Sequence, residues 1–284
     1  MPHHDGLPAS STLRAFAVIE LIANAEGPLS LDAITQRCGL PKPTVFRILG
    51  LLVRGGFATR VPIEKRYAVG PRLSALALQV QMHFPEREQR HAVLVRLVEE
   101  IGETCNFTMQ DGSEVVYLDR VETSSPVRLH MDAGSRVPLH CTASGKLFLS
   151  QLAPAQVRLL FGNGPLKRYT ARTLTSLDAL LRELRKVRTE GVGTDVGEYL
   201  EGSVCLAVPV TNGRGRICAT VAVHGPAPRM SLRKGIEYLP ALRSAARALA
   251  ATMTTRSDGA GAARKHAPSK SGSARGRHAL SEAR

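Results

Sequence analysis

Apolar residues recur with a helical period near the start of the chain, over residues 11–25. The positions that share one face are Val18, Leu21, Ile22 and Ala25. Spacings of three and four residues place side chains on the same side of a helix. Ser11 and Thr12 precede these positions and are candidates for the N-cap. The pattern predicts the first helix of an N-terminal domain.

Two shorter apolar stretches follow, with Gly39 between them. Ser30 has the chemistry of an N-cap for a helix over residues 31–38, and Gly39 suits the left-handed residue that ends a helix. Pro41 or Pro43 can begin the next helix. Its apolar positions, spaced i, i+3, i+4 and i+7, are Val45, Ile48, Leu49 and Leu52. Two short helices around a glycine turn are typical of a helix-turn-helix, although two helices of an ordinary bundle have the same pattern.

The opposite face of the second of these helices is cationic, which favours the DNA-binding interpretation. This face carries Pro43, Arg47, Gly50 and Arg54, with Lys42 and Thr44 near the helix N-terminus. Residues 55–61 and 66–70 then predict two strands around a polar tip. Between residues 30 and 67 there are seven Lys and Arg against two Asp and Glu, and such a surface gains affinity for DNA by releasing counterions.

These features together predict a winged helix-turn-helix, with the hairpin as its wing. The predicted DNA contacts are Arg47 to bases, Lys42, Pro43 and Thr44 beside it, and Arg54, Lys65 and Arg66 mainly to the phosphate backbone.

Helical periods return at residues 71–82 and, after Pro85, up to about residue 100. From residue 103 the period changes to that of strands. Predicted strands cover residues 104–110, 114–121, 127–131, 205–210 and 216–224, with turns at Asp111-Gly112 and Asn212-Gly213. Predicted helices cover residues 142–151, 154–161, 176–190 and 231–253. Strands joined by hairpins, with helices grouped rather than alternating, predict an α+β fold on an antiparallel sheet.

Composition narrows the class of protein. The 284 residues suffice for two modest domains, and the net charge of +14 favours anionic partners, nucleic acid first. No window approaches 18 uncharged apolar residues, and the start lacks the pattern of a signal peptide, so we expect no membrane association. The five cysteines are widely spaced without a Cys-x-x-Cys pair, which indicates reduced thiols in a cytoplasmic protein.

Several stretches match a known family in their order along the chain. They are Gly-Leu-Pro-Lys-Pro-Thr-Val-Phe-Arg-Ile-Leu at 39–49, Tyr-Ala-Val-Gly-Pro-Arg-Leu at 67–73, Val-Val-Tyr-Leu-Asp-Arg-Val-Glu at 115–122, the run 134–146, and Ala-Val-His-Gly-Pro at 222–226. The chain resembles IclR-type transcriptional regulators over about residues 10–254. Pro43 departs from the pattern, because a Ser or Thr is usual there and its hydroxyl can contact DNA.

The resemblance implies an arrangement of domains and partners. A winged helix-turn-helix at 10–70 and a linker helix at 71–84 precede an effector-binding domain at 85–254 with a GAF-like or profilin-like fold. We expect residues 1–9 to be a flexible N-terminus and 255–284, which lack an apolar period, to be a disordered basic tail. One recognition helix touches only a few base pairs, so a homodimer or homotetramer on a near-palindromic operator in double-stranded DNA is expected.

Residues 138–146 join a loop to the start of a helix, and their small side chains leave backbone N–H groups accessible. Such a helix N-terminus suits a carboxylate, although a tight turn that needs small residues has the same pattern. The resemblance implies that this turn holds the effector. The matching positions are Leu129 and Val137 as an apolar wall, Ala143 and Ser144 as backbone donors, and Asp195, Ser203, Cys205, Ala222 and His224.

The sequence departs from the family at the last two of these positions. Many members have Ser-Val-Ser-Gly where this chain has Ala222-Val-His224-Gly. A histidine there supplies a donor that can carry charge near neutral pH. Val196 and Gly197 also follow Asp195, where the family often has further acidic residues. We expect a small organic acid that also bears a hydroxyl or carbonyl group as the effector.

Other chemistry has weaker support in the sequence. His140, Cys141, Cys205, Asp195 and His224 could ligate a metal, but their spacing matches no zinc signature. Either cysteine could act as a nucleophile with a histidine as base, yet no nucleophile elbow, P-loop or dinucleotide fingerprint is present. We therefore expect no cofactor and no enzymatic activity. The alternative is a small-molecule sensor or enzyme that uses its helix-turn-helix for protein contacts.

Overall fold

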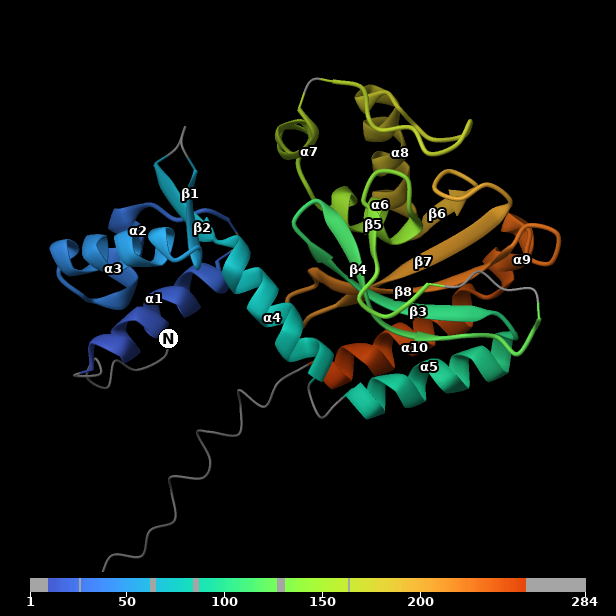
Figure 1. The fold of residues 1–284 in the computed structure, drawn as a ribbon, viewed down its shortest axis with the longest axis horizontal. Helices are drawn as coiled ribbons and strands as arrows, with labels where there is room; N and C mark the ends of the chain where they lie inside the picture. Colours follow the sequence, from blue (N-terminus) through green and yellow to red (C-terminus); the bar gives the residue numbers. More distant parts are fainter. Residues whose placement is uncertain are drawn as a thin grey trace, which may run out of the picture.

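The computed structural model describes residues 10–25, 27–61, 65–83, 87–126, 131–162 and 164–253 (Figure 1). The predicted tails at 1–9 and 255–284, the hairpin tip at 62–64, Leu129 and most of the expected strand 127–131 lie outside these ranges. Met131, the last residue of that expected strand, belongs to no strand. Among the helices of the described ranges, none has both the length and the apolar character that crossing a bilayer requires.

The described N-terminal residues form α1 (Ser11–Ala23), α2 (Leu31–Cys38), α3 (Lys42–Arg54), β1 (Ala58–Val61) and β2 (Arg66–Val69). The side-chain oxygen of Ser30 accepts a hydrogen bond from the Ala33 N–H at 3.2 Å, and Gly39 ends α2 with a φ of 65°. Both features confirm the sequence prediction. The expected cap of α1 is wrong, because Ser10 occupies the cap position and its carbonyl accepts from Arg14.

The N-terminal helices and the hairpin share one core. The apolar positions predicted for α3 are all buried, as are Val18, Ile34 and Tyr67 from the neighbouring elements. β1 and β2 pair antiparallel, with Ala58 opposite Val69 and Val61 opposite Arg66. The hairpin therefore follows directly after α3, as a wing does in a winged helix-turn-helix.

The C-terminal part is built on an antiparallel sheet, and this confirms the predicted α+β class. Within the described residues the strand order is β5-β4-β3-β8-β7-β6. The strands are β3 (Thr104–Asp111), β4 (Glu114–Val121), β5 (Arg136–Pro138), β6 (Gly193–Val196), β7 (Ser203–Thr211) and β8 (Ile217–Pro226). The short edge strands β5 and β6 were not predicted from the sequence, because three or four residues show too little alternation to be recognised.

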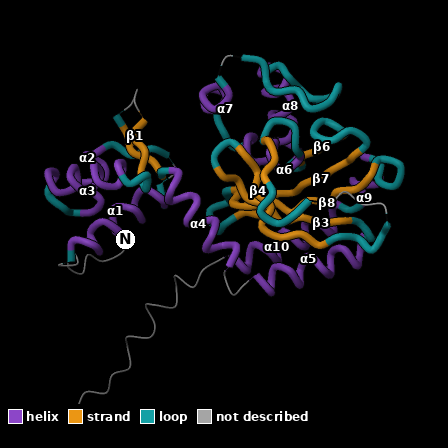
Figure 2. Tube along the Cα trace, viewed as in Figure 1, coloured by secondary structure: helices purple, strands orange, loops and turns teal. Residues whose placement is uncertain are grey.

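Helices cover both faces of this sheet (Figure 2). One face carries α5 (Arg87–Ile101) and α10 (Leu239–Met253), and the other carries α6 (Ala143–Ser150) with α8 (Leu177–Glu190) behind it. The alternation of each strand sorts its side chains between the faces. On β8, Val221 and Val223 join the core under α5 and α10, whereas Ala222 and His224 point to the side of α6.

Helix α4 (Pro71–His83) connects the two parts of the chain. It contacts β1 at one end and α5, β3 and β4 at the other, and Figure 1 shows it between the N-terminal helices and the sheet. The remaining helices, α7 (Pro154–Phe161) and α9 (Leu232–Glu237), lie at the periphery.

Two sequence predictions in this part are wrong in detail. The single helix expected over 231–253 is divided into α9 and α10 at Tyr238. Pro240 explains the division, since proline lacks an N–H and its ring collides with the preceding turn inside a helix. The turn expected at Asn212-Gly213 extends to Arg216, and Gly215 is the residue with positive φ, at 73°.

Candidate DNA-binding surface and ligand pocket

The outer face of α3 is open to solvent. Lys42, Pro43, Arg47 and Arg54 are exposed, and Thr44 is half-buried. The Lys42 ammonium lies 2.6 Å from the Asp32 carboxylate of α2, but both side chains are exposed, so this ion pair contributes little stability and can be exchanged for another anion. The residues that the sequence assigned to DNA contact on this helix therefore lie on one accessible face.

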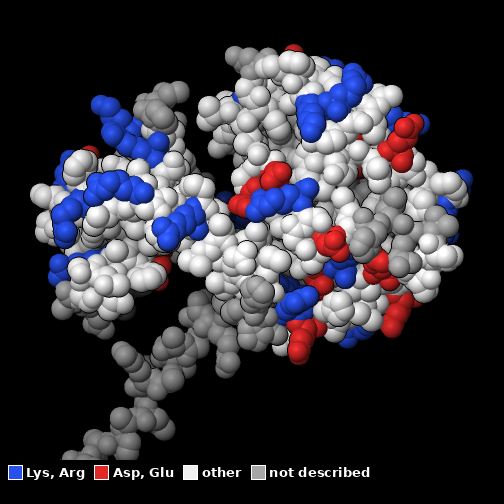
Figure 3. Space-filling view, in the orientation of Figure 1, with Lys and Arg blue, Asp and Glu red and all other residues white. Residues whose placement is uncertain are grey.

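The wing extends the same cationic character. Arg60 on β1 and Lys65 and Arg66 at the start of β2 are exposed. Figure 3 shows basic side chains gathered over the N-terminal helices and the hairpin. We refer to Lys42, Arg47, Arg54, Arg60, Lys65 and Arg66 as the cationic surface. Arg60 was not singled out from the sequence, although its place on an exposed strand next to the wing tip could have suggested it.

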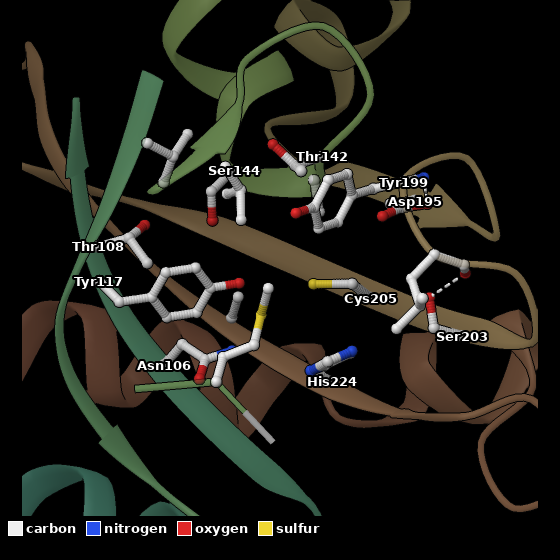
Figure 4. A pocket seen from close by; sticks show the side chains of 16 residues that line it. Asn106, Thr108, Tyr117, Thr142, Ser144, Asp195, Tyr199, Ser203, Cys205 and His224 are labelled. Carbon is white, nitrogen blue, oxygen red and sulfur yellow. Dashed lines mark hydrogen bonds between the residues drawn. The ribbon is translucent and has the colours of Figure 1, made fainter. Parts of the chain in front are cut away.

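A pocket opens on the α6 side of the sheet (Figure 4). It is narrow, with a cavity volume of about 30 Å³ within about 470 Å³ of unfilled space that includes open solvent. Of the predicted effector positions, the structure brings together Val137, Ala143, Ser144, Asp195, Ser203, Cys205, Ala222 and His224 in its wall. Thr142, another lining residue, belongs to the turn at 138–146 that the sequence indicated as a whole. The sequence did not indicate the remaining lining residues, which are Asn106, Thr108, Val115, Tyr117, Met131, Tyr199 and Leu200.

Helix α6 begins at the pocket because two glycines let it approach its neighbours closely. A Cβ on Gly145 would lie 2.2 Å from the Leu139 carbonyl oxygen, and one on Gly193 would lie 2.0 Å from the Ala143 carbonyl oxygen. The Thr142 side chain caps the helix by accepting from the Gly145 N–H at 3.3 Å. The first-turn N–H groups have no acceptor within their own helix, so Ala143 and Ser144 present donors at the pocket wall.

A β-bulge determines which side chains of β4 lie on the pocket side of the sheet. The register between β3 and β4 shifts between Phe107 and Thr108. As a result Arg120 pairs with Asn106 and Tyr117 pairs with Thr108, although both partners on β3 face the pocket side. The buried Arg120 guanidinium donates to the Asn106 side-chain oxygen at 3.0 Å. The bulge thus places a cation directly behind the pocket wall.

His224 on β8 is one of the polar residues that line the pocket. Its Nδ1 atom is buried and has no hydrogen-bond partner among the described residues. Burial lowers the pKa of His224 to about 4, and the charge of Arg120 acts in the same direction. The sequence expectation that this histidine carries charge near neutral pH is therefore wrong for the protein alone, because a buried imidazolium next to a guanidinium is unfavourable.

The pKa of the Asp195 carboxyl group is also shifted from its ordinary value. Burial raises its pKa to about 6, although it accepts hydrogen bonds from the N–H groups of Glu198 at 2.7 Å and Tyr199 at 3.4 Å. These bonds fix the loop that carries Tyr199 and Leu200 over the pocket. The same loop is held by the buried Lys146 ammonium, which pairs with the Glu198 carboxylate.

The thiols near the pocket are poor nucleophiles and poor metal ligands. Burial raises the pKa of the Cys141 thiol to about 12 and raises that of Cys205 further. Thiolates carry the reactivity of cysteine. In the described part of the chain, no group of three or more His, Cys, Asp or Glu side chains is placed to hold a metal ion.

Comparison with known proteins assigns the chain to a family. The model of the IclR helix-turn-helix domain matches residues 11–62, and that of the bacterial transcriptional regulator IclR C-terminal domain matches residues 81–251. The chain belongs to the IclR family of transcriptional regulators. It is thus a helix-turn-helix regulator, and neither the family nor its named relatives are enzymes.

Relatives within the IclR family extend over nearly the whole chain. The probable transcriptional regulator SauR of Cupriavidus necator is 46% identical over 84% of this chain and 94% of its own. The crystal structure of Thermotoga maritima IclR is similar with a TM-score of 0.56 and 29% identity, over 85% of this chain and 97% of that one.

A more distant IclR homologue from Microbacterium hydrocarbonoxydans was crystallised with 4-hydroxybenzoate. It has 23% identity, a TM-score of 0.54 and coverage of 86% of this chain and 98% of its own, so the likeness shows the fold alone.

Proposed function

We propose that this regulator binds a near-palindromic operator as a homodimer or homotetramer and that a small organic acid controls its occupancy. The observation that carries the proposal is the exposed Arg47 at the centre of the cationic surface, on a helix whose other face is fully buried. A helix with this division of its faces fits the major groove of DNA.

The positions of the residues in the cationic surface suggest which of them contact bases and which contact phosphates. Arg47 projects from the exposed face of α3 and can form two hydrogen bonds to a guanine edge. Lys42, Pro43 and Thr44 lie one turn earlier, where the start of a recognition helix meets the groove. Arg54 at the end of α3 and Lys65 and Arg66 on the wing are placed to neutralise phosphates, and Arg60 joins them.

The character of the pocket supports an anionic effector. The N–H groups of Ala143 and Ser144 can each donate a hydrogen bond to a ligand, and so can Nδ1 of His224, which has no partner in the part of the chain that the structure describes. Arg120 supplies positive charge behind the wall, and Asp195 is the pocket carboxylate with a raised pKa. The 4-hydroxybenzoate bound by the Microbacterium homologue is an acid with a hydroxyl group, of the class expected from this sequence.

The DNA-binding part is tested by fluorescence anisotropy on the duplex upstream of the gene that encodes this chain. Replacing Arg47 with Ala should weaken binding to the specific site by about 1–3 kcal/mol and relax base preference. Arg233→Ala, which removes an equal charge from the exposed surface of α9, is the control and should bind as the wild type does. An equal loss on all sequences would contradict the base-reading role of Arg47, and no binding across a range of salt would contradict the proposed function.

The effector part is tested by calorimetry with a panel of small hydroxy, keto and aromatic acids and their neutral amides. We expect an acid to bind and its amide to fail. His224→Ala should weaken acid binding. An affinity unchanged by that substitution would remove His224 from the ligand site.

A further inference from the structure

Phe46 is unusual among the apolar residues of α3. It lies next to Arg47 in sequence, and its side chain is 59% exposed, whereas the apolar face of the helix is buried in the N-terminal core. It therefore contributes little to that core. By helical spacing its neighbours on the exposed side of α3 are Lys42, Pro43 and Gly50.

Gly50 follows Phe46 by one helical turn and has no internal reason to be glycine. Its φ is not positive, and a Cβ at this position would meet only the Arg54 guanidinium at an ordinary contact distance of 3.6 Å. At Gly70, in contrast, a Cβ would lie 2.3 Å from a backbone oxygen. Glycine inside a helix is destabilising relative to alanine. The chain therefore has a destabilising glycine at position 50, where the packing of the protein would allow a larger residue.

The two residues are neighbours on the helix surface. Residues 46, 50 and 54 form an i, i+4 row, so an aromatic ring, a position without a side chain and a guanidinium follow one another along it. Arg47 lies beside the row, three residues before Gly50. A partner can come close to the helix backbone at Gly50 while touching the ring of Phe46 once the flexible Arg54 side chain, which lies over Gly50, turns toward solvent.

The charge around this row identifies the partner. The cationic surface surrounds it, so the partner is anionic, and in the proposed function it is DNA. The apolar group that DNA presents in its major groove is the C5-methyl group of thymine, which apolar side chains contact. Neither Phe46 nor Gly50 has a side chain that donates or accepts a hydrogen bond, so these two positions can contribute only an apolar contact.

We infer that Phe46 and Gly50 read a thymine in the operator: Gly50 admits the base edge close to the helix, and Phe46 covers the methyl group. This inference rests on the proposed function, because it requires that α3 lie in the major groove. It adds a base identity that Arg47 does not supply.

The experiment replaces each thymine of the operator in turn with deoxyuridine, which removes the methyl group and keeps base pairing. Burial of one methyl group corresponds to about three- to fivefold in affinity, and we expect a loss of this size at one position in each half-site. In the Phe46→Ala variant, the affinity for the thymine duplex divided by the affinity for the duplex with deoxyuridine at that position should fall to about one. Leu51→Ala, an exposed apolar residue on the other flank of α3, is the matched control and should leave the ratio unchanged.

Gly50→Ala provides a second, independent readout. The variant should melt at a higher temperature than the wild type and bind the operator at least fivefold more weakly, so stability and affinity move in opposite directions. Three results would each overturn the inference. They are an operator affinity unchanged by Gly50→Ala, an operator in which no thymine is sensitive to deoxyuridine, and a thymine-to-deoxyuridine affinity ratio unchanged by Phe46→Ala. A wild type that fails to bind any upstream duplex would instead overturn the proposed function.

Discussion

The imidazole of His224 is neutral at pH 7, because burial and the charge of Arg120 hold its pKa at about 4. An anion within hydrogen-bond distance would favour the protonated ring and raise this pKa. A bound anion should also raise the pKa of Asp195, which is about 6. The reason is that an ionised Asp195 carboxylate repels the anion. Both groups should take up protons when an acid binds.

Acid binding is therefore expected to tighten as the pH falls from 8 to 5.5, a range in which the carboxylic acid itself stays ionised. Linkage limits the gain to about tenfold per pH unit for each proton taken up. Calorimetry in buffers of different ionisation enthalpy measures this uptake directly.

Two variants separate the contributions to that proton uptake. His224→Gln and Asp195→Asn should each reduce it, and the double variant should abolish it. Affinity that does not vary with pH, or uptake that persists in the double variant, would show that neither group faces the bound anion.

At the scale of elements, α6 depends on close backbone contact. Gly145 lies against the Leu139 carbonyl, where a Cβ has no room. Gly145→Ala should lower the free energy of unfolding by about 1–3 kcal/mol, the usual cost of overpacking, and should weaken acid binding because α6 moves away from the pocket. The midpoint of urea unfolding measures the first effect.

Gly50→Ala is the matched comparison for this substitution, since it places the same methyl group on an open helix surface. It should shift the urea midpoint in the opposite direction. A midpoint raised by Gly145→Ala as well would show that α6 can adjust to the added group.

At the scale of the whole molecule, a hairpin connects the pocket to the N-terminal part. Strands β7 and β8 carry Cys205 and His224 in the pocket wall. At their turn, the Arg214 guanidinium donates to the Asn24 carbonyl at the end of α1, with a distance of 3.3 Å. A cation at a helix C-terminus is favourable, and the bond joins the turn between β7 and β8 directly to α1 in the helix-turn-helix domain.

Arg214→Ala should therefore reduce the change in operator affinity that the acid causes, while each ligand alone binds within about twofold of the wild type. Coupling between two sites is a free-energy difference, typically about 1–3 kcal/mol. Anisotropy titrations with and without acid measure it, and Arg216→Ala in the same turn is the control. Wild-type coupling in Arg214→Ala would assign transmission to α4 alone.

An element could be predicted from the sequence when the residues that cause it lie close together along the chain. Ser30, Gly39 and the apolar period of α3 act within one or two turns, so the helix-turn-helix and its exposed Arg47 follow from the sequence. The division at Tyr238 also has a local cause in Pro240, which the apolar period alone concealed. The edge strands β5 and β6 have no such signal, because they form only by pairing with β4 and β7.

The sequence by itself determined the order of helices and hairpins, the cationic face of α3 and, through its resemblance to a family, half of the residues around the pocket. Only the tertiary structure decided the electrostatics of that pocket. The bulge in β4 places Arg120 behind Asn106, and burial then makes His224 neutral and raises the pKa of Asp195. The reason is physical: local patterns act within a few residues along the chain, whereas pairing register and desolvation depend on residues that meet only after folding.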